Sequence, residues 1–293
     1  MDQRLQDIVA RTGELPALPS TTARLLTLLD EENAGVDAVM SVIAHDAALT
    51  ANLLKLCNSA YFGLRQRVGT VREALVWLGN RTVISLAFAT SLGDVLRGPL
   101  AGYRLERDAL WRHSLAVAIG SAHFAEAAGG RELRERAFTA GLVHDIGKLL
   151  LNGPLKARLQ QLPQTAGLDV VTRGEREILG FDHAEAGAAL AVAWNFPSWL
   201  AAVIAAHHDL AAAVASARGG AGGGDGQADL APSVLAANLT ATRAGLGAGT
   251  ACDDQEWDEA LAALGIDRVD AAAALARLPG DVAALAEGFG GAA

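Results

Sequence analysis

Histidines on apolar helices are the residues with the most chemistry to offer in this sequence. The chain has seven histidines, and four stretches hold the candidates: LWRHSLAV with His113, GLVHDIG with His144, GFDHAEAG with His183, and IAAHHDL with His207 and His208. Imidazole nitrogens and a carboxylate that converge from separate helices form a metal site. A single histidine on an apolar helix is more often a buried residue with one hydrogen-bond partner. Spacing alone does not show convergence, so both interpretations stay open.

The stretch GLVHDIGKLLL, residues 141 to 151, places His144, Asp145 and Lys148 inside an apolar run. In a phosphohydrolase, the His-Asp pair would hold a metal that activates water for attack on phosphorus. Asp145 would bridge the ions if two metals were bound. Lys148, one turn after His144, would neutralise the phosphate. The alternative for Lys148 is a surface lysine whose stem covers apolar side chains.

The composition favours helices as the elements that position these residues. Hydrophobic residues, mostly Ala and Leu, make up 51% of the chain, and aromatic residues make up 5%. Because Ala and Leu lose little freedom in a helix, we expect an all-α fold. Apolar residues keep helical spacing through the first hundred residues, with breaks at His45-Asp46 and Gly79-Asn80. A second helical series begins around Asp108.

Glycine and proline between residues 98 and 103 predict a boundary between two helical lobes. We expect an N-terminal helical lobe over residues 1–104 and a second helical lobe over residues 105–293. Within the second lobe, the Gly-rich segment 216–230 is too poor in apolar residues to pack. This segment is expected to be a flexible loop.

Charge and cysteine content restrict the partners and the compartment. A net charge of −9 repels a phosphate backbone, so we expect no direct binding of nucleic acid. Cys57 and Cys252 lie far apart and provide neither a zinc knuckle nor a disulfide framework. The N-terminal MDQRLQDIVA has no signal-peptide core, so the cytoplasm is the expected compartment. The uncharged run from Ala186 to Ala206 is interrupted at Asn195-Phe196-Pro197, which predicts a buried helix pair and no membrane insertion.

Ordered blocks over roughly residues 14 to 280 resemble the HDOD family, an HD-related output domain of bacterial signalling proteins. The blocks are LPALP, DAALTANLLKLCNSAYFG, TVREALVWLG, FTAGLVHDIGKLLL and EREILGFDHAEAGAALAVAWNFPSWLAAVIAAHH. The resemblance implies an all-helical two-lobed fold and a cytoplasmic regulatory role, generally without phosphohydrolase activity. Ala47 stands where the resemblance leads us to expect a proline.

The order of the histidines also resembles the HD superfamily and its cyclic-dinucleotide phosphodiesterase branch, HD-GYP. This resemblance implies a set of metal ligands: His113, His144, Asp145, His183, His207 and His208. The last ligand of the superfamily is an Asp, and its position here falls at Asn238 in SVLAANLTATRAG. Ala109 stands where some HD-GYP members carry a Glu, and no Gly-Tyr-Pro follows His208. Asn238 and Ala109 thus leave the implied site without two carboxylates.

A charge count weighs against a working two-metal centre. Asp145 is the only formal negative charge among the implied ligands, whereas Mg²⁺ and Mn²⁺ prefer several carboxylates. A single softer ion such as iron, zinc or nickel suits the imidazoles better. The expected cofactor is therefore a divalent metal, Fe, Zn, Ni or Mn, or none.

Three functional hypotheses follow. The leading one is a stand-alone signalling module that acts through protein–protein interaction with other signalling proteins, without catalytic residues. The alternative is a metal-dependent phosphohydrolase similar to cyclic-dinucleotide phosphodiesterases, with Lys148 in its catalytic site. In a third, the cluster never binds metal, and its crowded histidines repel one another when charged and have lowered pKa values. A nucleotide ligand stays open, although no residue pattern supports it.

Overall fold

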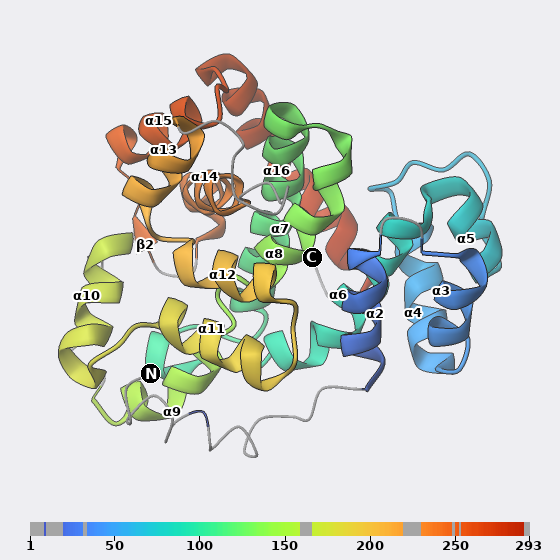
Figure 1. The fold of residues 1–293 in the computed structure, drawn as a ribbon, viewed down its shortest axis with the longest axis horizontal. Coiled ribbons are helices and arrows are strands. Elements are labelled where there is room, and N and C mark those ends of the chain that lie inside the picture. The colour runs from blue at the N-terminus through green and yellow to red at the C-terminus, as the bar shows by residue number, and fades with distance from the viewer. Residues whose placement is uncertain are drawn as a thin grey trace. The chain divides into compact units, whose positions relative to one another are not determined.

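The computed structural model describes residues 20–31, 34–158, 166–218, 230–247, 250, 251 and 253–289, and residue 9 by itself. Helices make up nearly all of the regular structure (Figure 1), which confirms the predicted all-α fold. The exception within these ranges is a parallel pair of two-residue strands, β1 (Ala166–Gly167) and β2 (Thr250–Ala251).

The chain divides into two compact units. One unit, here called the small unit, holds the described parts of Leu18–Val95 and Gly280–Ala293. The other, here called the histidine unit, holds the described parts of Met1–Ala17 and Leu96–Pro279 and contains the whole candidate site.

This division differs from the predicted one, which separates residues 104 and 105. Residues from Leu96 onward group with the histidine unit, because Leu100 and Leu105 exchange backbone hydrogen bonds of 2.9 and 3.0 Å. The chain from Gly280 onward groups with the small unit. Gly288 lies against Leu56 there, since a Cβ at Gly288 would be 2.9 Å from Leu56 Cδ2.

Helices of the small unit end and restart at the predicted breaks. They are α2 (Ser20–Asp30), α3 (Val36–Ile43), α4 (Ala47–Cys57), α5 (Val71–Leu78) and α6 (Asn80–Leu96). Asp46 caps α4, because its side chain accepts a hydrogen bond of 2.9 Å from Leu49 N. Gly79 separates α5 from α6. Both predicted breaks, at His45-Asp46 and at Gly79-Asn80, are confirmed.

The central helix of the histidine unit is α7 (Ala109–Gly129), which packs against α8 (Arg134–Val143) and α14 (Ala231–Ala241) (Figure 1). A Cβ at Gly141 of α8 would lie 2.7 Å from Val117 O of α7, so glycine permits the close approach of these two helices. The other elements of this unit are η2 (Ala101–Tyr103), η3 (Arg131–Leu133), α9 (Lys148–Lys156), α10 (Leu168–Leu179), α11 (His183–Ala193), α12 (Ser198–Ala206), α13 (Leu210–Arg218), η5 (Thr242–Leu246) and α15 (Asp254–Ala263). The last helix, α16 (Arg268–Gly288), belongs to this unit up to Pro279 and to the small unit from Gly280.

The uncharged run from Ala186 to Ala206 folds as α11 and α12. Asn195 adopts a φ of 56° between them, and Phe196 is buried. The predicted helix pair is confirmed. Of the helices in the described ranges, none has by itself the length and apolarity needed to cross a membrane. The pair of α3 and α4 meets that criterion by length and composition, with a bend of 118° between the two helices.

Most of the predicted loop 216–230 lies outside the described part of the chain, which omits residues 219–229. Residues 216–218 belong to α13, and Leu230 directly precedes α14. The helix extends into the predicted loop because the sequence LAAAVASAR is rich in alanine, the strongest helix former.

A close contact between α9 and α11 depends on Gly147. A Cβ at this position would lie 1.9 Å from His183 O and 2.5 Å from Gly187 N, so no side chain fits. Gly153, which lies within α9, offers a comparison because a Cβ there would meet nothing within 4 Å.

We therefore predict that Gly147→Ala lowers the free energy of unfolding by about 1–3 kcal/mol, because an overpacked contact forces the backbone to shift. Gly153→Ala should change it by no more than about 1 kcal/mol. Urea unfolding of both variants measures the difference. Equal effects of the two substitutions would contradict the close contact.

Candidate metal centre

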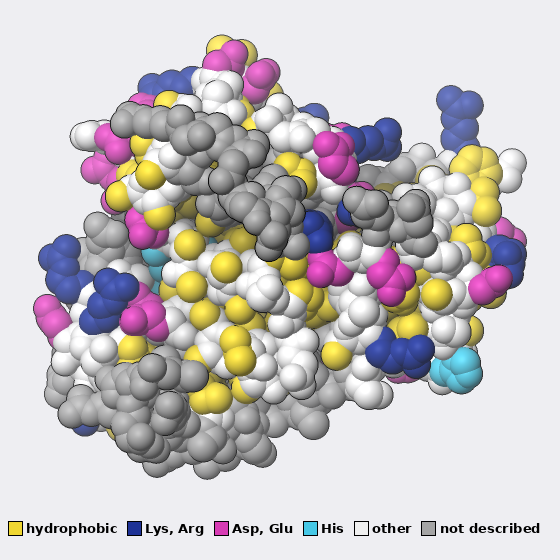
Figure 2. Space-filling view, in the orientation of Figure 1, with side chains coloured by type: hydrophobic (Ala, Val, Ile, Leu, Met, Phe, Trp, Pro, Cys, Tyr) yellow, Lys and Arg dark blue, Asp and Glu magenta, His cyan; other side chains and the backbone are white. Residues whose placement is uncertain are grey.

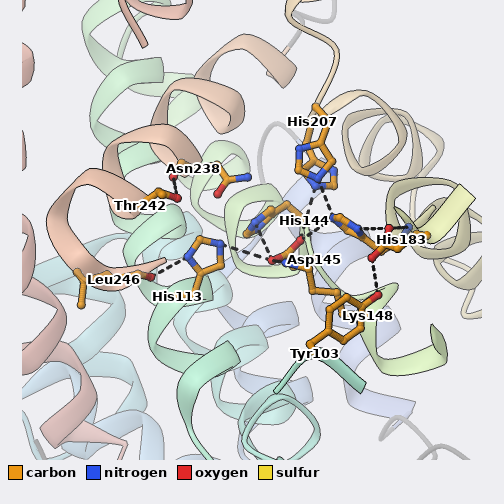
Figure 3. A network of polar contacts seen from close by, with 12 residues as sticks. Tyr103, His113, His144, Asp145, Lys148, His183, His207, Asn238, Thr242 and Leu246 are labelled. Carbon is orange, nitrogen blue, oxygen red and sulfur yellow. Dashed lines mark hydrogen bonds and ion pairs between the residues drawn. The ribbon is translucent and has the colours of Figure 1, made fainter. Parts of the chain in front are cut away.

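Four separate places in the histidine unit contribute to the candidate site (Figure 3). His113 lies in α7, His144 and Asp145 follow α8, His183 is the first residue of α11, and His207 and His208 follow α12. The structure thus brings the six predicted residues together. Most of these side chains stand at helix ends, where the chain can turn them towards one point.

The carboxylate of Asp145 lies at that point and is 1% exposed. Its Oδ1 is 3.1 Å from His183 Nε2 and 3.7 Å from His207 Nε2. Its Oδ2 is 3.4 Å from His144 Nε2 and 3.5 Å from His113 Nε2. His208 completes the cluster, with its Nε2 2.7 Å from His183 Nε2.

Backbone carbonyls fix the orientation of three rings. Their Nδ1 atoms lie within hydrogen-bond distance of these carbonyls: His113 at 2.9 Å from Leu246 O, His144 at 2.7 Å from Gly141 O, and His207 at 2.6 Å from Ile204 O. Because a carbonyl only accepts, Nδ1 carries the hydrogen and Nε2 of the neutral ring carries a lone pair. Within the described residues, Nε2 of His144 and of His207 has no hydrogen-bond partner. These buried lone pairs face a carboxylate, and a cation would satisfy both.

Electrostatics keeps Asp145 charged and two of its neighbours neutral. Burial lowers the pKa of His113 to about 3 and that of His207 to about 4, because a buried ring loses the hydration of its charged form. Burial alone would raise the pKa of Asp145, but His144 and Lys148 hold that pKa well below its usual value. The site therefore sets the Asp145 anion against neutral rings at His113 and His207, and the neutral ring is the form of histidine that binds a metal.

Lys148 is buried, so its interpretation as a surface lysine is wrong. The side chain is 3% exposed, and its Nζ donates to Asp145 Oδ2 over 2.6 Å. The ammonium also lies 5.7 Å from the centroid of the Tyr103 ring. A buried carboxylate needs a partner for its charge, and the three-residue spacing within the turn at the start of α9 supplies one.

Glu175 is a second buried carboxylate at the site, and it was not among the residues predicted from the sequence. It is 0% exposed, and its Oε2 lies 2.7 Å from His183 Nδ1 and accepts from His183 N over 2.8 Å. Tyr103 donates its hydroxyl to Glu175 Oε1 over 2.7 Å. Burial would lower the pKa of His183, but Glu175 and Asp145 raise it to about 9. Thr172 and Glu175, three residues apart, lie on the buried face of α10, and the sequence alone does not show that this face is buried.

Asn238 lies in α14 and is 2% exposed. Its backbone carbonyl accepts from Thr242 Oγ1 over 2.9 Å, and its side-chain Oδ1 has no hydrogen-bond partner among the described residues. Figure 3 shows its amide beside the cluster, on the side of His113 and His144. The predicted last ligand position is therefore occupied by a neutral amide in place of a carboxylate.

The donor atoms form two overlapping groups that could hold a metal ion. Asp145, His183, His207 and His208 offer four atoms within 4.8 Å of one another, and His113, His144 and Asp145 offer three. We call them the four-donor group and the three-donor group. Imidazole suits zinc, iron, nickel and copper. Nδ1 of each of four rings faces a fixed acceptor, so the residues present fit a metal at this position; the four rings are His113, His144, His183 and His207.

A cavity of about 420 Å³ borders the cluster at His208. Its lining combines apolar residues, among them Leu210, Leu235 and Leu239, with polar ones, among them Arg176, Asp182 and Glu256. His208 is partly exposed, whereas the other donor residues are buried. In Figure 2 a histidine side chain shows at the surface of this unit between acidic side chains.

Comparison with known proteins identifies a matching domain family and a relative of similar sequence. The model of the HDOD domain family matches residues 15–210. An uncharacterised protein of Treponema pallidum (strain Nichols) is 28% identical over 205 residues, which are 69% of this chain and 39% of that protein. The chain thus spans well under half the length of this relative.

Solved structures share the fold. An HDOD domain protein of unknown function from Geobacter sulfurreducens matches with a TM-score of 0.74 and 22% identity, over 97% of this chain and 98% of that one. A candidate phosphohydrolase from Shewanella amazonensis SB2B matches with a TM-score of 0.69 and 27% identity, over 98% of both chains. Because the family model covers more than half of the sequence, the chain belongs to the HDOD domain family.

Proposed function

We propose that this chain is a regulatory HDOD module of a bacterial signalling pathway, which binds one metal ion on the four-donor group and acts through contacts with signalling proteins. It does not turn over phosphate esters. The observation that carries the proposal is the buried ammonium of Lys148, 2.6 Å from Asp145 Oδ2. When bound, the ion would supply a Lewis acid at the edge of the cavity.

The shared carboxylate limits the centre to one ion. Asp145 Oδ1 faces His183 and His207, whereas Oδ2 already pairs with Lys148. A second divalent ion in the three-donor group would lie beside the ammonium, and like charges repel strongly where water is excluded. Asn238 offers that ion an amide where a carboxylate would offset its charge.

The charge of the cavity also disfavours an anionic substrate. Among the described residues that line the cavity, Arg176 is the one arginine or lysine. Its Nη2 lies 2.6 Å from Asp182 Oδ2, and its Nε lies 3.7 Å from Glu185 Oε2. Asp209 and Glu256 add further negative charge to the lining. A phosphate group approaching His208 would meet net repulsion.

A contact surface for a protein partner has support in the small unit. On α5, Val76 and Trp77 are 77% and 60% exposed. Tryptophan is enriched where proteins bind one another, because it buries a large area at low entropy cost. We therefore regard protein contacts as the output of the module.

A metal-dependent phosphohydrolase stays the alternative. The observation in its favour is the same Lys148, which could leave Asp145 for a bound phosphate. The relative from Shewanella amazonensis is described as a candidate phosphohydrolase. The alternative needs the pair of Lys148 and Asp145 to open, and a buried ion pair is costly to break.

The first prediction concerns the position of the ion. Protein purified without chelators from cells supplied with iron, manganese and zinc should contain about one ion per chain. His183→Ala should lose most of it, because that ring belongs to the four-donor group. His113→Ala is the matched control and should keep it. Elemental analysis by plasma mass spectrometry measures both. Equal loss in the two variants would contradict the assignment.

A second prediction concerns turnover. Metal-loaded protein and its His144→Ala variant should show the same background rates with bis(p-nitrophenyl) phosphate and with a cyclic dinucleotide. The reason is that the negative charge of the cavity lining repels an anionic substrate, and that Asp145 Oδ2 is already paired with Lys148. The opposite result is that the native protein hydrolyses one of these substrates at a rate that falls by about tenfold or more in the variant. That result would refute the proposal and favour the phosphohydrolase.

The third prediction adds the missing carboxylate. Asn238→Asp should raise the metal content from about one towards about two ions per chain, because a second anion offsets the charge of a second cation. Asn238→Ala removes the amide without adding charge and should leave the content unchanged. If Asn238→Asp binds no additional metal, then the shortage of carboxylates is not the reason why the site holds only one ion.

A further inference from the structure

Glu175 stands out among the buried charges because the proposed function does not use it. It belongs to α10, and its two oxygens make three contacts, with His183 N, His183 Nδ1 and the hydroxyl of Tyr103. Burial would raise its pKa, but the charge of His183 and these hydrogen bonds lower it. A buried carboxylate with every oxygen occupied is held firmly in one place.

His183 differs from the other rings in its Nδ1 acceptor. The Nδ1 atoms of His113, His144 and His207 each face a neutral backbone carbonyl. His183 alone among these four faces a carboxylate. A carboxylate on the far nitrogen fixes the ring and makes Nε2 a stronger metal ligand. That Nε2 points into the four-donor group, 3.1 Å from Asp145 Oδ1.

Tyr103 is tied to the same part of the fold. It ends η2, and the preceding residue, Gly102, donates its N–H to Asn152 Oδ1 over 2.8 Å. A Cβ at Gly102 would lie 2.3 Å from Asn152 O, so this contact requires glycine. Asn152 belongs to α9, the helix that begins at Lys148. The Tyr103 hydroxyl is therefore placed by the helix that carries the counterion of Asp145.

We propose that Glu175, held by Tyr103, is a positioning residue of the metal centre, which fixes the His183 ring with Nε2 towards the ion and strengthens that nitrogen as a ligand. The inference rests on the proposed metal site. Glu175 also supplies a second negative charge close to the proposed ion, whereas the ligand residues supply only the charge of Asp145.

Metal affinity tests this inference. Glu175→Gln preserves the shape of the side chain and removes its charge, and it should weaken Zn²⁺ binding by about 10–100-fold in competition with a chromophoric chelator. Tyr103→Phe keeps the carboxylate and should have a smaller effect in the same direction. The absorption spectrum of the Co²⁺-loaded protein should shift in Glu175→Gln, because one ligand changes its donor strength.

Asp182→Asn is the matched control. Asp182 is also buried and lies next to His183, but its side chain accepts from Glu185 N and pairs with Arg176. This variant should keep its Zn²⁺ affinity even if the start of α11 is less stable. Unchanged affinity in Glu175→Gln would overturn the inference. Equal loss of affinity in both variants, in step with their unfolding temperatures, would overturn it as well.

An experiment on the metal-free protein separates this inference from the proposed function. The ¹⁵N-resolved NMR signal of the His183 ring should show a strongly deshielded Nδ1 proton, which disappears in Glu175→Gln and persists in Asp182→Asn. If the native protein takes up no Zn²⁺, the metal site fails and with it the role of Glu175 in metal binding, whereas the ring signal still shows whether Glu175 orients His183. Absence of that signal in the native protein would refute the orientation itself.

Discussion

The buried charge of Asp145 is the constraint on which the rest of the histidine unit depends. An ionised carboxylate at 1% exposure costs several kcal/mol unless other groups compensate it. Lys148 provides that compensation from within the same turn, and the surrounding imidazoles add polar contacts. The protein can therefore hold this carboxylate without a metal, and Oδ1 would be the oxygen left to hold an ion, because Oδ2 is paired with Lys148.

Two of the rings, those of His144 and His207, are oriented by the same local contact with a helix end. His144 directly follows α8, and His207 directly follows α12. The Nδ1 of each ring lies within hydrogen-bond distance of a carbonyl three residues earlier, Gly141 O and Ile204 O. The last carbonyls of a helix lack intrahelical partners, so each ring satisfies one of them and directs its Nε2 away from the helix. The helix end thus determines that Nε2, and not Nδ1, points to the centre of the cluster.

Local patterns in the sequence sufficed for the helices and for most of the site. The breaks at Gly79 and around Asn195 could be predicted because glycine and proline act on their own neighbourhood. The histidine set could be named from resemblance, although its convergence depends on contacts between distant helices. Glu175 and the burial of Lys148 escaped prediction, because a charged residue on a helix is usually solvated and only tertiary packing decides otherwise.

A crystal structure of the metal-loaded protein, with anomalous scattering recorded at the absorption edge of the bound element, would locate the ion. We expect a single anomalous peak within the four-donor group, with Lys148 still paired to Asp145 Oδ2. Two peaks, one of them between His113 and His144, would contradict this expectation and would return the phosphohydrolase to first place.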